Sequence, residues 1–175
     1  TLIHNETFSF ANAAPDFRRK LLDRSIFITD EIFSKTWFSY HRALKQRNFL
    51  LKNNRKSDIY AWNEKLSTEG DILTSYRKKF FKSCYSEFYL LLKELDLVNV
   101  FDFFETMSIE FFQGWDSNLS LLEVFENNIN KDLQRKITTV GPHRSDIKFL
   151  IKKQDAKQIM SRGEQKFFSI LWSCS

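Results

Sequence analysis

Two long stretches with apolar residues at helical spacing dominate the hydrophobic pattern of the chain. The first begins at Thr29 or Asp30 and ends near residues 53–54, and the second runs from about Ser57 toward Asp96. Apolar residues three or four positions apart fall on one face of a helix. The pattern therefore predicts two helices that pack as a short antiparallel arm through two stripes: Phe33, Trp37, Tyr40, Leu44 and Leu51, and then Leu66, Ile72, Tyr76, Phe80, Cys84, Phe88, Leu91 and Leu95.

The segments around the arm predict a part that mixes helices with strands. Pro15 can open a short helix, and Ser120 can cap another that runs to about Gln134. Gly70 interrupts the second arm helix at a cost of about 1 kcal/mol relative to Ala, so we expect a bend there. Alternating apolar and polar residues indicate three strands, at residues 1–10, 103–112 and 147–151. Together these elements predict an α+β fold that is mainly α.

The composition fits a cytosolic protein with long helices. Phe is abundant, at 19 residues, whereas there are only four glycines and two prolines. Cys84 and Cys174 lack the spacing of a metal site, so we expect reduced thiols and no zinc. The net charge of +5 is compatible with nucleic acid but does not require it. No apolar run reaches the roughly 18 residues of a membrane span, and because the chain begins without Met and stops within a predicted helix, we expect an excised fragment.

The segment from Met160 to Lys166 is the strongest candidate for binding chemistry. Ser161 precedes Glu164 by the three residues of a capping box, and Gly163 has no side chain to block an approach to the backbone. A helix N-terminus with basic neighbours is a site for a phosphate group. A plain capping box is the alternative, because the unrelated segment Ser120-Leu121-Leu122-Glu123 has the same spacing.

Four motifs in order along the chain resemble those of the RecF family of DNA repair proteins, which have ABC-type ATPase heads. They are Arg18-Arg19-Lys20-Leu21-Leu22-Asp23, Ala43-Leu44-Lys45-Gln46-Arg47-Asn48, Gly141-Pro142-His143-Arg144-Ser145-Asp146 and the signature-like Ser161-Arg162-Gly163-Glu164-Gln165-Lys166. The resemblance implies part of a P-loop NTPase fold with four regions: head and arm base at 1–28, helical arm at 29–99, a returning segment at 100–137, and the signature-bearing head segment at 138–175. The chain lacks both Gly-x-x-x-x-Gly-Lys-(Ser/Thr) and an apolar run ending in Asp-Glu, so the fragment alone should be inactive and should bind no cofactor.

The resemblance also implies the activity of the complete protein. It would be a slow DNA-dependent ATPase that binds ATP and Mg²⁺, forms an ATP-dependent homodimer, and acts in the bacterial cytoplasm at gapped DNA or at single-/double-strand junctions with RecO and RecR. The signature residues of one subunit, Ser161, Arg162, Gly163, Glu164, Gln165 and Lys166, would contact ATP held by the other. Weaker nucleotide-adjacent candidates are Glu6, Arg18, Arg19, His143 and Arg144. For His143 we favour a structural or ligand-adjacent role over catalysis, since no nucleophile accompanies it.

The basic residues of the arm are candidates for DNA contact, with a solvated helix surface as the alternative. A basic arm could follow a DNA backbone in a salt-sensitive manner. The candidate residues are Arg42, Lys45, Arg47, Lys52, Arg55 and Lys56, and Arg77 is assigned to the same outer surface. Two rival functions remain open: a non-enzymatic helical scaffold or DNA-binding module, and another ABC-type repair head of the RecN, Rad50 or SMC kind, against which the short arm and the Gly-Pro-His-Arg element argue.

Overall fold

The structure, a computed structural model, describes residues 10–175 and divides into two compact units. Unit 1 comprises the residues up to Leu22, Lys79–Phe111 and Asp146–Ser175; unit 2 comprises Asp23–Lys78 and Phe112–Ser145. Both units are therefore assembled from segments that lie far apart in the sequence. These boundaries differ from the four regions expected from the sequence, because part of the second arm helix belongs to unit 1. The strand expected at residues 1–10 lies almost wholly outside the described residues.

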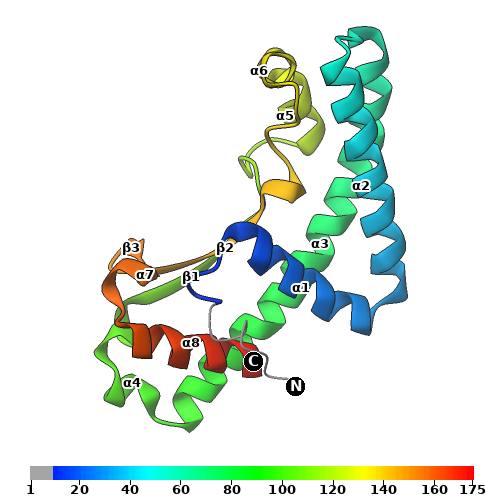
Figure 1. Ribbon diagram of the computed structural model, residues 1–175. Coiled ribbons are helices and arrows are strands. Elements are labelled where there is room, and N and C mark those ends of the chain that lie inside the picture. The colour runs from blue at the N-terminus through cyan, green and yellow to red at the C-terminus, as the bar shows by residue number, and fades with distance from the viewer. Residues whose placement is uncertain (1–9) are drawn as a thin grey trace. The chain divides into compact units, whose positions relative to one another are not determined.

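Two long helices, α2 (Glu31–Lys52) and α3 (Lys56–Glu94), form the predicted arm (Figure 1). The Asp30 side chain caps α2 by accepting from the N–H groups of Ile32 and Phe33, at 2.8 and 3.0 Å. The pairing of α2 with α3 is antiparallel, because Phe33 meets Tyr76 at 5.6 Å between ring centroids while Leu51 clusters with Ile59. The prediction of an antiparallel helix pair is confirmed.

The buried face of the arm differs from the predicted stripes. Leu73 is fully buried, whereas its neighbour Ile72, which the pattern placed in the core, is 41% exposed. Gly70 lies inside an unbroken helix, and its lack of a side chain serves packing: a Cβ there would lie 2.5 Å from Leu121 Cδ2 and 3.3 Å from Tyr40 Cε2. Gly70 therefore lies on the buried face of α3, close to Leu121 and Tyr40.

Two short helices, rather than one, follow Ser120. The predicted capping box at Ser120 is present, but α5 (Leu121–Asn127) ends at Asn128, and α6 (Ile129–Arg135) follows. The Asn128 side chain donates to the Val124 carbonyl at 2.8 Å, and such local side-chain bonds compete with helix continuation. The prediction of one continuous helix from Ser120 to about Gln134 was therefore wrong.

A three-stranded antiparallel sheet with the order β1-β2-β3 forms the β part of unit 1. Its strands are β1 (Met107–Phe112), β2 (Asp146–Ile151) and β3 (Gln154–Asp155). The strand predicted from residue 103 begins only at Met107, because η2 (Asp102–Thr106) occupies the first half. Phe104 is buried in this turn and its ring lies 4.3 Å from that of Phe103, so consecutive aromatic packing overrides the alternation.

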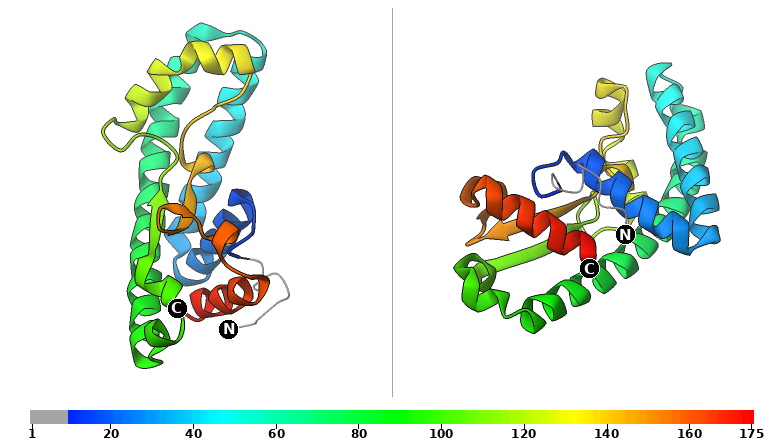
Figure 2. Two further views of the ribbon diagram at one scale, coloured as in Figure 1. Left: turned by 90° about the vertical axis from the view of Figure 1, so that its left-hand side faces the viewer. Right: turned by 60° about the horizontal axis from the view of Figure 1, so that its bottom comes forward.

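Aromatic side chains form the core of unit 1. Phe168, on α8 (Arg162–Cys174), meets Phe149 of the sheet at 4.8 Å and Phe88 of α3 at 5.5 Å between ring centroids, both edge to face. Figure 2 shows α8 lying beside the strands. The remaining helical segments are α1 (Pro15–Thr29), α4 (Leu97–Val100), α7 (Ala156–Ile159) and, in unit 2, η3 (Pro142–Arg144). The core therefore fixes the direction of α8, whose first residues carry the signature-like motif.

The hairpin between β2 and β3 turns on Lys152 and Lys153, whose φ angles are +50° and +67°. Two-residue hairpin turns of this kind favour Asn-Gly, because a side chain in the left-handed region costs about 1–2 kcal/mol. We expect Lys153→Gly to raise the free energy of unfolding by about 1 kcal/mol, measured by urea denaturation. The control Lys148→Gly, within β2, should instead lower it by about 0.5–1 kcal/mol.

Candidate functional sites

The start of α8 presents two backbone N–H groups toward open space. Ser161 Oγ accepts from the N–H of Glu164 at 3.3 Å, and the Glu164 carboxylate accepts from the N–H of Ser161 at 2.6 Å, which confirms the predicted capping box. Within residues 10–175, the N–H groups of Arg162 and Gly163 have no partner. Around Gly163, a Cβ would meet only Ser161 Oγ, at 4.0 Å, so packing in this chain does not require a glycine there. The geometry can accept an anion.

Gln165 holds this helix start in place from beneath. Its side-chain amide donates to the carbonyls of Met160 and Lys157, at 2.8 and 2.9 Å, and its oxygen accepts from the Asn12 side chain. The residue is 7% exposed. We expected Gln165 to contact a nucleotide, but its side chain is committed to bonds within the chain, whereas Ser161, Arg162, Gly163 and Lys166 are exposed and Glu164 is half-buried.

The first and third motifs meet through an ion pair in unit 1. Arg18 Nε and Nη2 donate to the two carboxylate oxygens of Asp146, each at 2.8 Å, and Arg18 Nη1 donates to the Ala13 carbonyl at 2.6 Å. Arg19 lies 3.5 Å from the carboxylate of Asp16. Arg18 therefore fixes the start of β2 through a bidentate pair, a geometry that planar guanidinium groups favour. Glu6 lies outside the described residues.

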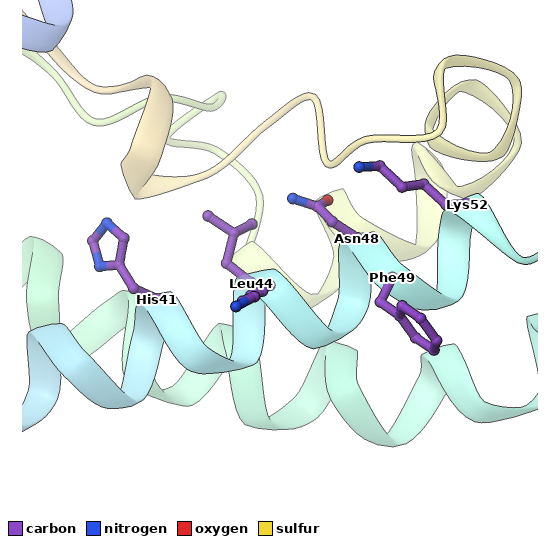
Figure 3. Close-up of a pocket in the computed structure, with 6 residues that line it drawn as sticks. His41, Leu44, Asn48, Phe49 and Lys52 are labelled. Carbon is purple, nitrogen blue, oxygen red and sulfur yellow. The ribbon is translucent and has the colours of Figure 1, made fainter.

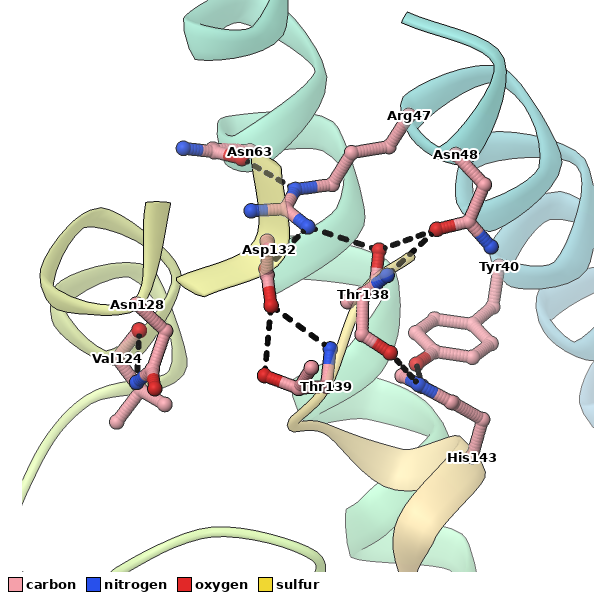
Figure 4. Close-up of polar contacts among 10 residues, drawn as sticks. All are labelled: Tyr40, Arg47, Asn48, Asn63, Val124, Asn128, Asp132, Thr138, Thr139 and His143. Carbon is pink, nitrogen blue, oxygen red and sulfur yellow. Dashed lines mark hydrogen bonds and ion pairs between the residues drawn. The ribbon is translucent and has the colours of Figure 1, made fainter. Parts of the chain in front are cut away.

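A buried polar network centred on Arg47 occupies the interior of unit 2 (Figure 4). Arg47 Nη1 donates to Asp132 Oδ2 at 2.7 Å and to Thr138 Oγ1 at 2.8 Å, while Arg47 Nε donates to Asn63 Oδ1 at 2.7 Å. The guanidinium carbon also lies 5.0 Å above the Phe125 ring centroid. Burial lowers the pKa of Arg47, and the hydrogen bond and charge of Asp132 oppose that shift.

The assignment of Arg47 to a DNA-binding surface was wrong. Both Arg47 and its partner Asp132 are fully buried, so neither can reach a DNA phosphate in this structure. Arg77, also assigned to the outer surface, is only 2% exposed and makes a bidentate pair with Asp23 at 2.8 Å. Both arginines can be buried because each pairs with a carboxylate elsewhere in the chain, Asp132 or Asp23. The helical pattern could not reveal these partners.

His143 has a structural position in the same unit. Its Nε2–H donates to the Thr138 carbonyl at 3.0 Å, because a carbonyl can only accept, and Nδ1 accepts from the Tyr40 hydroxyl at 2.8 Å. Burial raises the pKa of Tyr40 well above its ordinary value, so the phenol stays protonated and remains a donor. These bonds favour the structural interpretation of His143, while Arg144 is exposed.

Five of the six predicted DNA-contact residues are exposed on the arm. These are Arg42, Lys45, Lys52, Arg55 and Lys56. Lys45 and Lys52 line a hollow of about 390 Å³ beside α2 (Figure 3). Among the described residues, no three His, Cys, Asp or Glu side chains lie close enough to hold a metal ion. No helix within residues 10–175 is both long and apolar enough to cross a membrane.

Sequence reasoning missed the buried partners Asp23, Asn63, Asp132 and Thr138. The signal was present in the motifs themselves: Asp23 ends the first motif and pairs with Arg77, while Arg47 and Asn48 in the second motif bind Asp132 and Thr138. Charged residues within a motif can therefore mark buried pairs as readily as ligand contacts.

The sequence comparison and the structure comparison both find similarity to the same protein, RecF. No protein-family model matches the chain. The DNA replication and repair protein RecF of Nitrosococcus oceani is 34% identical over 163 residues, which cover 90% of this chain and 43% of that protein. RecF of Pseudomonas aeruginosa (strain LESB58) is 31% identical over 167 residues, covering 94% and 44%. The chain thus spans less than half the length of these curated relatives.

Two solved structures have the same fold. The recombination mediator protein RecF with ATP, in the RecFOR pathway, has a TM-score of 0.80 at 22% identity, over 97% of this chain and 48% of that one. A second RecF structure, with ATPrS, has a TM-score of 0.82 over 98% and 48%. In sequence and in fold, the chain is therefore similar to one part of RecF.

Proposed function

We propose that the chain supplies the arm and the signature helix of an ATP-dependent DNA-binding protein that acts in recombinational repair. The names of the relatives, DNA replication and repair protein RecF, support the repair role. The observation that carries the proposal is the open N-terminus of α8, with two N–H groups that have no partner among the described residues and an exposed glycine between basic side chains.

The start of α8 suits the terminal phosphate of an ATP molecule bound to a second copy of the protein. The positive end of the helix dipole and the N–H groups of Arg162 and Gly163 favour an anion, and such donors act most strongly where water is excluded. Gln165 positions this segment from within the chain rather than touching the ligand. The pairing of two subunits around ATP would bury the phosphate and so complete the site.

Other parts of the complete protein would hold the rest of the ATP and its Mg²⁺. The chain contains no Gly-x-x-x-x-Gly-Lys-(Ser/Thr) loop, and the described residues bring no metal-binding cluster together. ATP supplies the phosphate charge that draws the two subunits together. The isolated chain should therefore neither bind nor hydrolyse ATP. RecO and RecR are proposed as partners because the structural relative is described within the RecFOR pathway.

The arm would contact DNA through its exposed basic side chains: Arg42, Lys45, Lys52, Arg55 and Lys56. From Ile32 to Lys52, α2 contains no acidic residue, so every charged side chain in that stretch is basic. Each phosphate that a lysine or arginine neutralises releases a counterion. DNA affinity should therefore fall steeply with salt, and Arg47 should not contribute to that dependence.

Ser161→Arg in the complete protein tests the role of α8. The longer, charged side chain would fill the space before the helix, so we expect loss of ATP-dependent dimerisation, while the monomer still binds ATP. Sedimentation velocity with and without ATP measures the dimer. Ser120→Arg is the matched control, because Ser120 also caps a helix through a capping box but lies in unit 2. An undiminished dimer for Ser161→Arg would reject the proposal.

A non-enzymatic scaffold or DNA-binding module is the second candidate. The capping box of Ser120 and Glu123 has the same bonds as that of Ser161 and Glu164, which shows that this arrangement needs no nucleotide. If Ser161→Arg and Ser120→Arg both leave ATP-dependent association unchanged, the scaffold function is better supported than the nucleotide-contacting function.

A further inference from the structure

One exposed segment of unit 1 combines negative charge with apolar side chains. It runs from the last two turns of α3 through α4 into η2, around the α4 label in Figure 1, and lies entirely within unit 1. We call it the acidic face. Its exposed members are the carboxylates Glu87, Glu94, Asp96, Asp102 and Glu105 and the apolar residues Leu90, Leu95 and Val100.

The charge of the acidic face is not balanced within the described chain. Residues 87–105 contain five acidic residues and one lysine, Lys93, although the whole chain has a net charge of +5. Within residues 10–175, none of these five carboxylates forms an ion pair. By contrast, the exposed Asp16 and Glu31 each pair with a lysine four residues further along a helix. The acidic face therefore keeps its full negative charge available to a partner.

The end of α3 adds to this negative potential. The last carbonyl groups of a helix carry partial negative charge, so cations are favoured there and anions are disfavoured. Helix α3, which is 39 residues long, nevertheless ends at Glu94, and Asp96 follows with a φ of +52°. The Asp96 carboxylate accepts from the Asn99 side chain at 2.7 Å, which leaves its charge in place. Two carboxylates at the negative end of a long helix reduce its stability and attract cationic groups.

Three exposed apolar side chains lie among these carboxylates. Leu90, Leu95 and Val100 are 48%, 56% and 64% exposed. Leu90 is three residues after Glu87 and four before Glu94, a spacing that places all three on one side of α3. Leu95 lies in the turn directly after α3, and Val100 ends α4. Apolar side chains grouped on a surface and bordered by polar ones are typical of protein interaction sites.

The charge of the acidic face determines which class of partner fits it. Nucleic acid and anionic lipid surfaces are negative, so the carboxylates repel both. Among the described residues, no three His, Cys, Asp or Glu side chains lie close enough to hold a metal ion, so the carboxylates are too dispersed for a single cation. A protein segment that carries several lysines or arginines along with apolar residues matches both features. A helix with one basic and one apolar side presents them together.

We propose that the acidic face binds a basic amphipathic helix of a partner protein. The apolar side of that helix packs on Leu90, Leu95 and Val100, and its lysines or arginines pair with the surrounding carboxylates. The inference does not depend on the proposed ATP or DNA sites, because both of those bind anions and this face binds cations. A partner held in this way occupies a surface that DNA avoids, so it does not compete with DNA for its place on the protein.

A labelled synthetic helix with leucines on one side and lysines on the other tests the acidic face in the complete protein. Fluorescence anisotropy at low salt measures its binding, and we expect no binding by a peptide with glutamate in place of each lysine. Glu94→Lys should weaken binding of the lysine peptide about 2- to 10-fold, since it turns an attractive charge into a repulsive one. Glu64→Lys is the matched control, because Glu64 is also exposed on α3 but lies in unit 2, and it should leave binding unchanged.

A second pair of variants tests the apolar contact. Leu95→Ser should weaken binding of the lysine peptide about 5- to 30-fold, because the leucine surface that the peptide covers is lost. Ile72→Ser is the matched control, since Ile72 is 41% exposed on α3 but lies in unit 2. Urea unfolding of each variant shows whether the complete protein keeps its stability.

Three results would overturn the inference. Wild-type protein that does not bind the lysine peptide, or binds the glutamate peptide equally well, has no such docking surface. If Glu94→Lys weakens binding but Leu95→Ser does not, the carboxylates attract cations in general and no helix packs on the apolar residues. If Leu95→Ser strongly lowers the free energy of unfolding of the complete protein, the acidic face is packed against another part of that protein and cannot receive a partner.

Discussion

Replacing Arg47 with Met should lower the free energy of unfolding by about 3–5 kcal/mol, because the change strands a buried carboxylate. Asp132 is fully buried, and its ion pair with Arg47 is 2.7 Å long. Desolvation of a charge is strongly unfavourable unless an opposite charge or hydrogen bonds compensate for it. Two bonds from Thr139, at 2.9 and 2.6 Å, would remain, but the positive charge would be gone. Urea unfolding followed by tryptophan fluorescence measures the loss.

Two companion variants isolate the cause. Lys45→Met changes an exposed lysine on the same helix. Its free energy of unfolding should stay within about 0.5 kcal/mol of the wild-type value. The double replacement Arg47→Met with Asp132→Leu removes both charges, together with the Arg47 Nη2 group that lacks a partner in the described structure. It should recover at least half of the lost stability, since apolar replacements of buried pairs are often tolerated. Equal losses for Arg47→Met and Lys45→Met would contradict this account.

The elements that local sequence determines were predicted well. The arm helices follow from their apolar spacing and from caps such as Asp30, and the capping box at Ser161 follows from a spacing of three residues. The β2–β3 hairpin turns on Lys152 and Lys153, which lack the Asn-Gly typical of such a turn, so no local signal marks its position. Local chemistry was therefore sufficient for these elements, although the helix break at Asn128 shows that a local side-chain bond can also be missed.

Long-range partners account for what the sequence did not reveal. Arg47 and Asp132 are 85 residues apart, and Arg77 and Asp23 are 54 apart, so nothing near either arginine shows that it is buried. A basic residue on an amphipathic helix is usually solvated. The errors at Ile72 and Leu95 in the predicted stripe have a related origin, because α3 packs against distant segments, as Gly70 does against Leu121.

Gly114→Ala should lower the free energy of unfolding by about 2–5 kcal/mol, combining backbone strain with a clash. Gly114 has a φ of +106°, which side chains rarely adopt, and its added Cβ would collide with the Gly141 carbonyl oxygen. That oxygen belongs to backbone, so it cannot move aside as a flexible side chain could. The N–H of Gly141 also donates to the Gly114 carbonyl at 3.2 Å, so both chain segments would have to shift. Thermal and urea unfolding measure the effect.

Gly163→Ala is the informative counterpart, because the same methyl group meets open space in a helical segment. We expect the free energy of unfolding to rise by at most about 1 kcal/mol relative to wild type, since Ala is the better helix former. Because the fold does not need a glycine there, this variant tests the proposal that a phosphate approaches the backbone at Gly163. Gly163→Ala should therefore weaken ATP-dependent dimerisation of the complete protein while Gly114→Ala weakens folding. A Gly163→Ala protein that dimerises like wild type would show that the space in front of α8 is not where the phosphate lies.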